Sequence, residues 1–496
     1  MLRFQLLKFK VEVLNETTFY NIIKQQFGHV PTKGQERLLY ATARLMFSVK
    51  DHCVFIVRGF AGTGKTTSVK AIVDSLKLIN HQSVLLAPTG RAAKVLSQYS
   101  ERPAFTIHKK IYQKKTTMDT ESGFGLRQNL HKNTLFIVDE ASMISSGQSM
   151  GAMFGSRDLL SDLLNFVFTG KNCRLMLIGD DAQLPPVGSD HSPALDYTFM
   201  RDTFSLTLAQ THLTEVKRQA LNSGILYNAT ILRDQLGSEE NFIPQLSESV
   251  FEDVQRVNGA ELQDFLEDSV NKHGIENVII VTRSNKRANL FNQQVRHRLL
   301  WHENDIDAGD YLMVVRNNYF WLDESSNKTT DFIANGDALE VIKIRGREKR
   351  YGFEFATIEG RLLDYPDLPP MEMIILIDTI MAETPNLGPE KSKALYHYVA
   401  EDYADLGNRK AIHKAIMRDP YYNALQVKFA YAVTCHKSQG GQWPAVFVDQ
   451  GYLTDELIDK EFVRWLYTAI TRAQQELYFV NFAESFFVDD KKPLEI

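Results

Sequence analysis

The feature that most constrains the fold of this chain is a glycine-rich loop at residues 59–66. Its sequence is Gly59-Phe60-Ala61-Gly62-Thr63-Gly64-Lys65-Thr66, and it lies between an apolar run at 54–57 and a helical pattern over 67–78. In a strand–loop–helix unit of this kind, backbone N–H groups surround a polyphosphate at the helix N-terminus, where the helix dipole favours negative charge. The loop therefore predicts a site for a nucleoside triphosphate.

Two side chains of this loop have a predicted chemical role. Lys65 is placed to reach the terminal phosphates, and the hydroxyl of Thr66 is placed to hold Mg²⁺. ATP and Mg²⁺ are accordingly the cofactors that we expect. The residues predicted to contact the nucleotide in this loop are Gly59, Gly62, Thr63, Gly64, Lys65, Thr66 and Thr67.

The length, net charge and cysteine content of the sequence limit the classes of protein to which the chain can belong. A chain of 496 residues is too long for a single hydrophobic core, so several domains are expected. The formal net charge of −5 implies that any nucleic acid is held in a local positive groove, because nucleic-acid-binding domains are usually basic. No apolar run approaches the ~20 residues of a membrane-spanning helix, and the N-terminus does not resemble a secretory signal. Cys53, Cys173 and Cys435 are far apart, so neither a zinc site nor a disulfide framework is indicated.

Continuous apolar runs in the first two hundred residues predict a parallel β-sheet. Such runs, each followed by a polar loop, are typical of strands buried on both faces. Ligands of open α/β sheets bind beyond the carboxyl ends of the strands, so the loops after these runs should converge on one site. The four runs are 54–57, 84–87, 135–138 and 175–178.

A second α/β pattern begins near residue 214 and is interrupted by a different one. Its expected strands are 278–281, 429–433, 446–448 and 477–480, with a helical segment at 286–300. Between them, short strands separated by turns predict a small β-barrel, followed by a charged helical arm at 389–417. The expected barrel strands are 311–315, 338–344, 353–358 and 373–377.

These patterns give a domain plan in the α/β class. A polar break around Gly123-Phe124-Gly125 predicts a β-hairpin insertion at 110–132. The plan is an N-terminal segment at 1–30, a first α/β domain at 31–213, a second at 214–300 and 426–496, and the barrel with its arm at 301–425.

Acidic residues follow the third predicted strand. Asp139 can hold Mg²⁺ through water, opposite Thr66. Glu140 can orient and deprotonate the attacking water. The alternative is that the two acids only cap a helix.

Polar residues that could act on the γ-phosphate occur at three further places. Gln183, within Gly179-Asp180-Asp181-Ala182-Gln183-Leu184-Pro185-Pro186-Val187, is suited to bind the γ-phosphate or the water, and the alternative is a tight turn. Arg218 and Arg472 lie outside the first domain and are candidates for arginine fingers. Most single arginines are surface residues, so this role depends on the motif context.

With these motifs in order, the chain resembles a superfamily 1 DNA helicase of the RecD/Dda-like branch, over about residues 32–481. The resemblance implies that Gln35 reads the adenine and that Arg218 and Arg472 are the first and second arginine fingers. It also implies a set of residues that contact single-stranded DNA. These are Pro88, Thr89, Arg91, Thr106, His108, Thr434, His436, Lys437 and Ser438.

The family fold implied by the resemblance has two RecA-like P-loop domains that form an ATP cleft. The hairpin insertion in the first domain is implied to be a strand-separating pin. The insertion in the second domain is implied to be an SH3-like β-barrel with a helical extension that braces the pin. Phe124, near the hairpin tip, could stack on the last base pair, since base–aromatic stacking contributes ~1–3 kcal/mol per base. An exposed turn aromatic without a role is the alternative.

The function implied by the resemblance is an ATP-dependent DNA helicase that translocates 5′-to-3′ on single-stranded DNA. The expected partners are single-stranded DNA and duplex/single-strand junctions, and not a membrane. A monomeric motor is expected in the cytoplasm, associated with the nucleoid, with single-strand-binding or replication and repair proteins as candidate partners. Two alternatives remain: an RNA helicase or remodeller, and a DNA-dependent ATPase that displaces bound proteins without unwinding.

Overall fold

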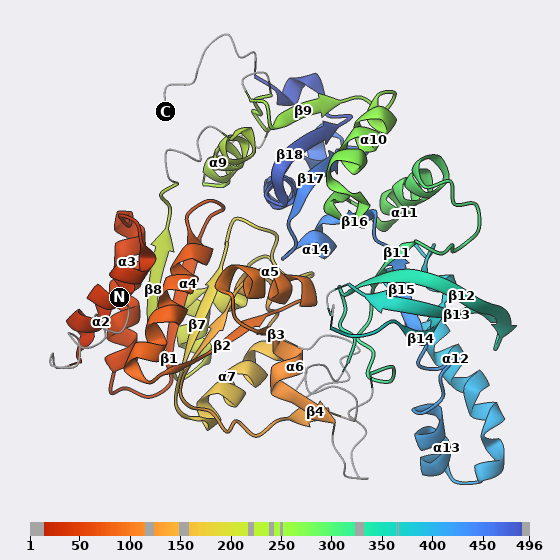
Figure 1. Ribbon diagram of the computed structural model, residues 1–496, viewed down its shortest axis with the longest axis horizontal. Coiled ribbons are helices and arrows are strands. Elements are labelled where there is room, and N and C mark those ends of the chain that lie inside the picture. Colours follow the sequence, from red (N-terminus) through yellow and green to blue (C-terminus); the bar gives the residue numbers. More distant parts are fainter. Residues whose placement is uncertain are drawn as a thin grey trace. The chain divides into compact units, whose positions relative to one another are not determined.

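The structure is a computed structural model that describes residues 14–114, 124–147, 158–216, 223–237, 243–248, 251–322, 332–363, 365 and 367–488. The chain divides into two compact units (Figure 1). The first comprises Met1–Pro88 and Ala92–Asn222, and the second comprises Thr89–Arg91 and Ser223–Ile496. None of the described helices is long and apolar enough to cross a bilayer.

The first unit is built on a six-stranded parallel sheet with the order β3-β2-β6-β7-β1-β8. The four apolar runs of the sequence all lie in strands of this sheet, so their prediction is confirmed. These are β1 (Cys53–Gly59), β2 (Gln82–Ala87), β6 (Lys132–Val138) and β7 (Lys171–Gly179). The two edge strands, β3 (Ala104–Thr106) and β8 (Thr207–Leu213), were not predicted.

Both faces of this sheet are covered by helices, which explains the continuous apolar runs. On β1, Phe55 and Val57 belong to one hydrophobic core, whereas Val54 and Ile56 belong to another. The first core includes residues of α2 (Glu16–Phe27), α3 (Lys33–Phe47) and α4 (Lys65–Leu76). The second includes residues of α6 (Ile107–Ile111), α7 (Leu159–Thr169) and α8 (Tyr197–Thr203).

Helix α2 belongs to the first unit, although the sequence placed its residues in a separate N-terminal segment. Its buried Phe19 and Ile23 are part of the same core as β1. The helix begins where the side chain of Asn15 accepts a hydrogen bond from the backbone N–H of Thr18 at 3.0 Å, and it ends at Gly28, whose φ is 72°. The expected boundary at residue 30 therefore cuts off a helix that fills the core.

An antiparallel pair of short strands lies within the range predicted for the hairpin insertion. Strand β4 (Tyr112–Lys114) pairs with β5 (Phe124–Leu126), with Lys114 opposite Phe124. Residues 115–123 and the side chain of Phe124 lie outside the described part of the structure. The role of Phe124 as a pin therefore stays a prediction.

The second unit contains a five-stranded parallel sheet with the order β16-β10-β17-β18-β9. Its strands are β9 (Val254–Val257), β10 (Val278–Thr282), β16 (Ala432–Thr434), β17 (Trp443–Asp449) and β18 (Ala473–Val480). The predicted strands at 278–281, 446–448 and 477–480 are confirmed. The helices of this part are α9 (Gly224–Leu236), α10 (Leu262–His273), α11 (Asn285–Gln294), α14 (Cys435–Ser438) and α15 (Lys460–Ile470).

A closed five-stranded barrel is inserted into the second unit, together with a helical arm (Figure 1). Two helices, α12 (Pro389–Asp402) and α13 (Arg409–Ile416), form the predicted arm. Leu395 and Val399 of the arm share a buried cluster with Phe355 and Leu376 of the barrel. The barrel strands are β11 (Tyr311–Val314), β12 (Ala338–Arg350), β13 (Phe353–Leu362), β14 (Met371–Leu376) and β15 (Leu425–Phe429).

The fifth barrel strand corrects the sequence analysis, which returned the chain to the second α/β domain at residue 426. Strand β15 closes the barrel by pairing with β11 and β14. The next strand, β16, starts at Ala432, so the predicted strand at 429–433 contains a bend between two sheets. Hydrophobic periodicity could not locate this bend, because the residues on both sides of it are apolar.

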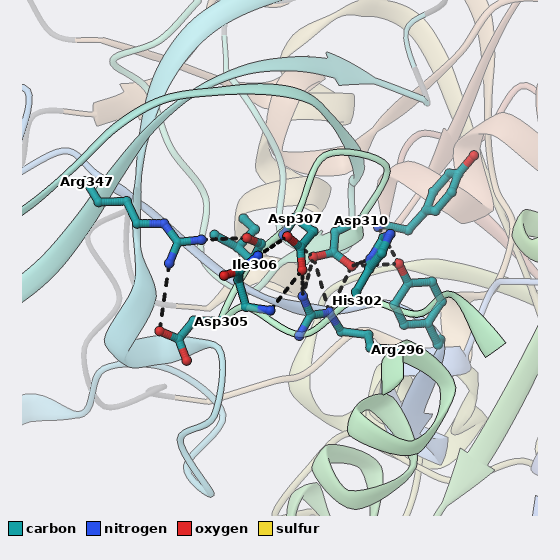
Figure 2. Close-up of polar contacts among 10 residues, drawn as sticks. Arg296, His302, Asp305, Ile306, Asp307, Asp310 and Arg347 are labelled. Carbon is teal, nitrogen blue, oxygen red and sulfur yellow. Dashed lines mark hydrogen bonds and ion pairs between the residues drawn. The ribbon is translucent and has the colours of Figure 1, made fainter. Parts of the chain in front are cut away.

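The chain passes between the sheet and the barrel twice, and both passages meet at the buried Asp310. Figure 2 shows the contacts of Asp310 with the outgoing passage. On the outgoing passage, Arg296 of a π-helical turn (Val295–Leu299) donates to Oδ1 and Oδ2 of Asp310, each at 2.9 Å, and to Oδ2 of Asp307 at 3.1 Å. On the return passage, the hydroxyl of Tyr431 donates to Oδ1 of Asp310 at 3.1 Å. We call Arg296, Asp307, Asp310 and Tyr431 the Asp310 joint.

A metal ion is not needed to explain this cluster. His302, Asp307 and Asp310 offer ligand atoms within 4.8 Å of one another. Both carboxylates, however, already accept from Arg296, and Oδ2 of Asp310 also accepts from the backbone N–H of Asp307 at 2.7 Å. Removing one partner of such a buried ion pair typically costs about 3–5 kcal/mol of stability. The cluster is therefore a structural joint.

Candidate functional site

Three loops converge in the first unit at the carboxyl ends of adjacent strands. Strands β6, β7 and β1 are neighbours, and they end at Asp139, Asp180 and the glycine-rich loop. The first two loops lie against each other at Gly179. A Cβ at this position would come within 2.9 Å of the backbone nitrogen of Ser142 and 2.8 Å of Cδ1 of Leu195. The loops after β1, β6 and β7 thus follow neighbouring strands of the sheet, while a common site for the loops after all four predicted strands stays a prediction.

The glycine-rich loop leads directly into α4. Gly64 stands at the N-cap with a φ of 81°, a left-handed conformation that a side chain would strain, and it provides no side-chain cap. The first N–H groups of a helix have no partner within the helix, so they are available to an anion. Thr66 and Thr67 belong to this first turn, and the hydroxyl of Thr63 donates to the carbonyl of Phe60 at 2.7 Å. The residues present therefore fit a polyphosphate.

Lys65 is held by its own loop. Its ammonium donates to the carbonyl oxygens of Gly59 at 2.6 Å and Phe60 at 3.0 Å. Phosphate oxygens can take the place of these two carbonyls, because a lysine ammonium offers three donors on a flexible stem.

Gln35, on α3, contacts the glycine-rich loop through a hydrogen bond that the sequence did not suggest. Its side-chain carbonyl accepts from the backbone N–H of Thr32 at 3.0 Å, and its amide donates to the carbonyl of Thr63 at 2.9 Å. The side chain is buried, and a Cβ on Gly64 would lie 2.5 Å from its Nε2. Gln35 thus braces the glycine-rich loop, and its reading of adenine stays a prediction.

Glu215 was missed by the sequence analysis. Its carboxylate accepts from the backbone N–H of Gly34 at 3.1 Å, and a hydrogen bond from Thr32 lowers its pKa. Glu215 thus ties the chain after β8 to the start of α3. A single glutamate after a strand gives no indication of such a contact in a sequence.

Asp139 and Glu140 occupy the end of β6 in an unusual backbone conformation. The backbone N–H of Glu140 donates to Oδ1 of Asp139 at 2.9 Å, and the φ of Glu140 is 52°. Burial and the charge of Glu140 raise the pKa of Asp139, while Lys65 opposes that shift. Glu140 makes no side-chain cap to the short helical turn that follows, so the capping alternative finds no support there. The carboxylate of Asp139 and the hydroxyl of Thr66 are of the oxygen class that Mg²⁺ prefers.

Gln183 lies in a buried turn. Its backbone N–H donates to the carbonyl of Asp180 at 3.4 Å, and Oδ1 of Asp180 accepts from the backbone N–H of Ala182 at 3.0 Å. Arg58, just before the glycine-rich loop, lies 3.4 Å from Oδ2 of Asp181. The turn is thus joined to the strand that carries the phosphate loop. A role of Gln183 toward phosphate stays a prediction.

Residues predicted to contact DNA from the first unit lie at the ends of β2 and β3. Pro88 follows β2, and Thr106 caps α6 by accepting from the backbone N–H of Lys109 at 3.2 Å. Burial lowers the pKa of His108 to about 4. The imidazole is therefore neutral at pH 7, so a contact with a phosphate would not be an ion pair.

Thr89–Arg91 group with the second unit, whose strand end carries the other predicted DNA contacts. The guanidinium of Arg91 lies 3.8 Å from the ring centroid of Trp443. Thr434 precedes α14, where Ser438 donates to the carbonyl of Cys435 at 2.8 Å. Burial lowers the pKa of His436.

Of the two predicted arginine fingers, one is described. Arg472 is buried, and its guanidinium donates to the carbonyl of Thr468 at 3.0 Å and to the hydroxyl of Thr471 at 3.1 Å. Arg218 lies outside the described residues. The finger roles of both stay predictions.

Two protein families match the chain. An AAA domain matches residues 40–235, and a UvrD-like helicase C-terminal domain matches residues 429–480. The first match contains the glycine-rich loop and its neighbouring strand ends. The second contains Lys437 and Arg472.

The chain also has curated relatives. The ATP-dependent DNA helicase dda of Enterobacteria phage T4 is 25% identical, over 90% of this chain and 99% of its own length. The ATP-dependent RecD2 DNA helicase of Deinococcus radiodurans is 30% identical, over 40% of this chain. An uncharacterized protein of Methanocaldococcus jannaschii is 24% identical, over 97% of this chain. The aligned regions cover only 24% of RecD2 and 41% of the Methanocaldococcus protein.

Among solved structures, a Pif1 helicase from Bacteroides in complex with ADP-AlF3 and ssDNA has a TM-score of 0.43 and 13% identity, over 93% of this chain and 95% of that chain. The assignment of the chain rests instead on the two domain families, the two helicase relatives and the order of the motifs. Together, the two domain families and the two helicase relatives support a superfamily 1 helicase similar to RecD2 and Dda.

Proposed function

We propose that this protein is an ATP-dependent DNA helicase that moves 5′-to-3′ on single-stranded DNA and separates the duplex ahead of it. The observation that supports it most is the meeting of three loops in the first unit. They bring together a phosphate loop with Lys65, the carboxylates of Asp139 and Glu140, and the Gln183 turn. The helicase relatives support the substrate, and the 5′-to-3′ polarity rests on the resemblance to the branch.

The proposed hydrolysis assigns each residue one task. Lys65 and the N-terminal N–H groups of α4 bind the phosphates. Thr66 and Asp139 would hold Mg²⁺, which would neutralise part of the phosphate charge. Glu140 orients the water and accepts its proton, and Gln183 contacts the γ-phosphate or the water. Arg218 and Arg472 stabilise the charge that develops on the γ-phosphate.

The proposed DNA path uses residues of both units. Thr434, His436, Lys437 and Ser438 contact the strand from the second unit, and Arg91, with Pro88, Thr89, Thr106 and His108, contacts it as well. The β4–β5 hairpin with Phe124 is the proposed pin, and we propose that the barrel is of the SH3-like kind. The proposed state is a monomeric motor associated with the nucleoid in the cytoplasm.

ATP-dependent unwinding of one duplex carrying either a 5′ or a 3′ single-stranded tail tests this proposal. We expect unwinding with the 5′ tail only. Lys65→Ala should abolish both ATP turnover and unwinding, because the variant lacks the ammonium at the phosphates. Unwinding with the 3′ tail only would contradict the polarity, and normal ATP turnover in the variant would contradict the site.

ATPase assays with single-stranded RNA and DNA, together with the unwinding assay, separate the alternatives. Stronger stimulation of the ATPase by single-stranded RNA than by DNA would indicate an RNA helicase or remodeller. DNA-stimulated turnover that leaves both tailed duplexes intact would indicate a translocase that displaces proteins.

A further inference from the structure

The starting observation is a lysine in the second unit whose ammonium nitrogen is buried and has no hydrogen-bond partner among the described residues. Nζ of Lys437, in α14, has no exposed surface and no hydrogen-bond partner among the described residues. Burial and the nearby charge of Lys428 lower the pKa of Lys437 to about 8. An ammonium in this state has lost its water without gaining another acceptor, which is costly.

The neighbouring lysine lies on a barrel strand. Lys428, in β15, is 6% exposed, and its ammonium donates to the backbone carbonyl of Ala382. Burial lowers the pKa of Lys428 to about 8 as well. A lysine has three donors, and the carbonyl of Ala382 accepts one of them.

The acceptor of Lys428 is fixed from a third element. Asn289, on α11, donates its amide hydrogens to the carbonyls of Met381 at 2.9 Å and Ala382 at 3.2 Å. These bonds hold the segment after β14 in place, so the lysine is anchored at a defined position. In the described part of the chain, no carboxylate forms an ion pair with Lys428 or Lys437.

Two desolvated ammonium groups that repel one another and form no ion pair with a carboxylate in the described part of the chain are an incomplete electrostatic arrangement. Desolvation and mutual repulsion both disfavour the charged pair. An anion between them would relieve both effects, and a phosphate group has the oxygen acceptors that two ammonium groups need. The flexible four-carbon stem of a lysine allows each ammonium to turn toward such an oxygen.

We propose that Lys428 acts together with Lys437 to bind one phosphate group of the nucleic-acid strand. This inference rests on the proposed function, since Lys437 lies in a segment proposed to contact DNA. Lys428 adds to that contact a residue from the barrel, so the strand is held by the inserted domain and the sheet at the same phosphate.

Salt dependence of DNA binding is the property that identifies a phosphate contact. On single strands, each phosphate contact contributes a slope of about 0.7 to the plot of log affinity against log salt. The experiment measures the dissociation constant of a fluorescent single-stranded oligonucleotide, without nucleotide, at several salt concentrations. It compares the wild-type chain with Lys428→Met, Lys428→Arg and Lys349→Met.

We expect Lys428→Met to weaken binding and to reduce the slope by up to about 0.7. Lys428→Arg should retain the slope, because it retains the charge. Lys349→Met removes one charge from an exposed position on β12 of the same barrel and should leave the slope unchanged. Thermal unfolding of each variant verifies that it is folded, and Lys428→Arg keeps the comparison valid if Lys428→Met is unstable.

The outcomes distinguish this inference from the proposed function. No salt-dependent DNA binding by the wild-type chain would contradict the proposed function itself. If the wild-type chain binds DNA and Lys428→Met shows the same salt slope, Lys428 does not contact a phosphate and only holds the carbonyl of Ala382. The proposed function would be unaffected by that result. A change in ATP affinity without DNA, with an unchanged DNA slope, would assign the phosphate to the nucleotide and also overturn the inference.

Discussion

Two lysines that we assign to phosphate groups lie in opposite electrostatic situations. Lys65, in the first unit, donates to two carbonyls of its own loop, at 2.6 and 3.0 Å. Lys437, in the second unit, is enclosed without any acceptor among the described residues. Hydrogen bonds of a charged group contribute about 1.5–3 kcal/mol each. The ammonium of Lys65 therefore has hydrogen-bond acceptors even without a ligand. The ammonium of Lys437, in α14, has none among the described residues, so an anion would lower the free energy of its charged form.

The difference follows from the local backbone. The glycine-rich turn exposes the carbonyls of Gly59 and Phe60 on the side of the Lys65 ammonium. Lys437 lies in a four-residue helix whose own bonds occupy nearby groups, such as the carbonyl of Cys435, which accepts from Ser438. ATP must then displace existing contacts of Lys65, while a DNA phosphate gains contacts that Lys437 lacks.

The strongest test of the first half of this comparison is Glu140→Gln. The variant keeps the phosphate loop and Lys65 but loses the group proposed to accept the proton of the water. General-base catalysis typically contributes 10²–10⁴-fold, so the turnover number should fall by about that factor while nucleotide affinity is preserved. Measuring both quantities by steady-state ATPase assay and by equilibrium binding of a fluorescent nucleotide separates the two effects. Glu390→Gln, on the exposed arm, is the matched control, and an active Glu140→Gln would refute the assignment.

The second half of the comparison predicts a pH dependence. The pKa of Lys437 and that of Lys428 are both lowered to about 8, and a bound phosphate favours the charged form of each. Above about pH 8 the free protein loses these protons and must take them up again to bind. Affinity for single-stranded DNA should therefore fall as pH rises, by up to about tenfold per pH unit for each lysine. Titration at constant ionic strength measures it, and Lys428→Met should make the fall less steep; a flat wild-type profile would argue against the pair.

The smallest expected effect concerns Gln35. Gln35→Ala removes the hydrogen bond to the carbonyl of Thr63, which is worth about 0.5–1.5 kcal/mol. ATP affinity should fall by a few-fold up to about tenfold, and calorimetric titration with ATP and with GTP measures it. An equal loss for both nucleotides would show that Gln35 braces the loop. A loss confined to ATP would show that it reads the adenine.

The buried strands could be predicted from the sequence because a short run that is apolar at every position is typical of a strand covered on both faces. Runs such as 135–138 are apolar at every position, and β6 is indeed covered on both faces. Strand β8 was missed because, as an edge strand, it mixes polar and apolar residues without a regular period and is only partly buried. The bend after β15 was missed because Phe429, Ala430 and Tyr431 are all apolar, although they connect two different sheets.

The candidate site was predictable where spacing defines it and not where distant segments meet. The phosphate loop and Asp139 follow from local motifs. The bonds of Gln35 to Thr63 and of Lys428 to Ala382 join segments 28 and 46 residues apart. A lysine within a strand ordinarily indicates a solvent-facing position. Only the closed barrel shows that Lys428 is buried.

The Asp310 joint has a mechanical consequence. A domain inserted through two linkers can swing about either one unless both are fixed, and here a single carboxylate accepts from Arg296 on one linker and from Tyr431 on the other. Rotation of the barrel and the arm about either linker would therefore have to break a hydrogen bond to the buried Asp310.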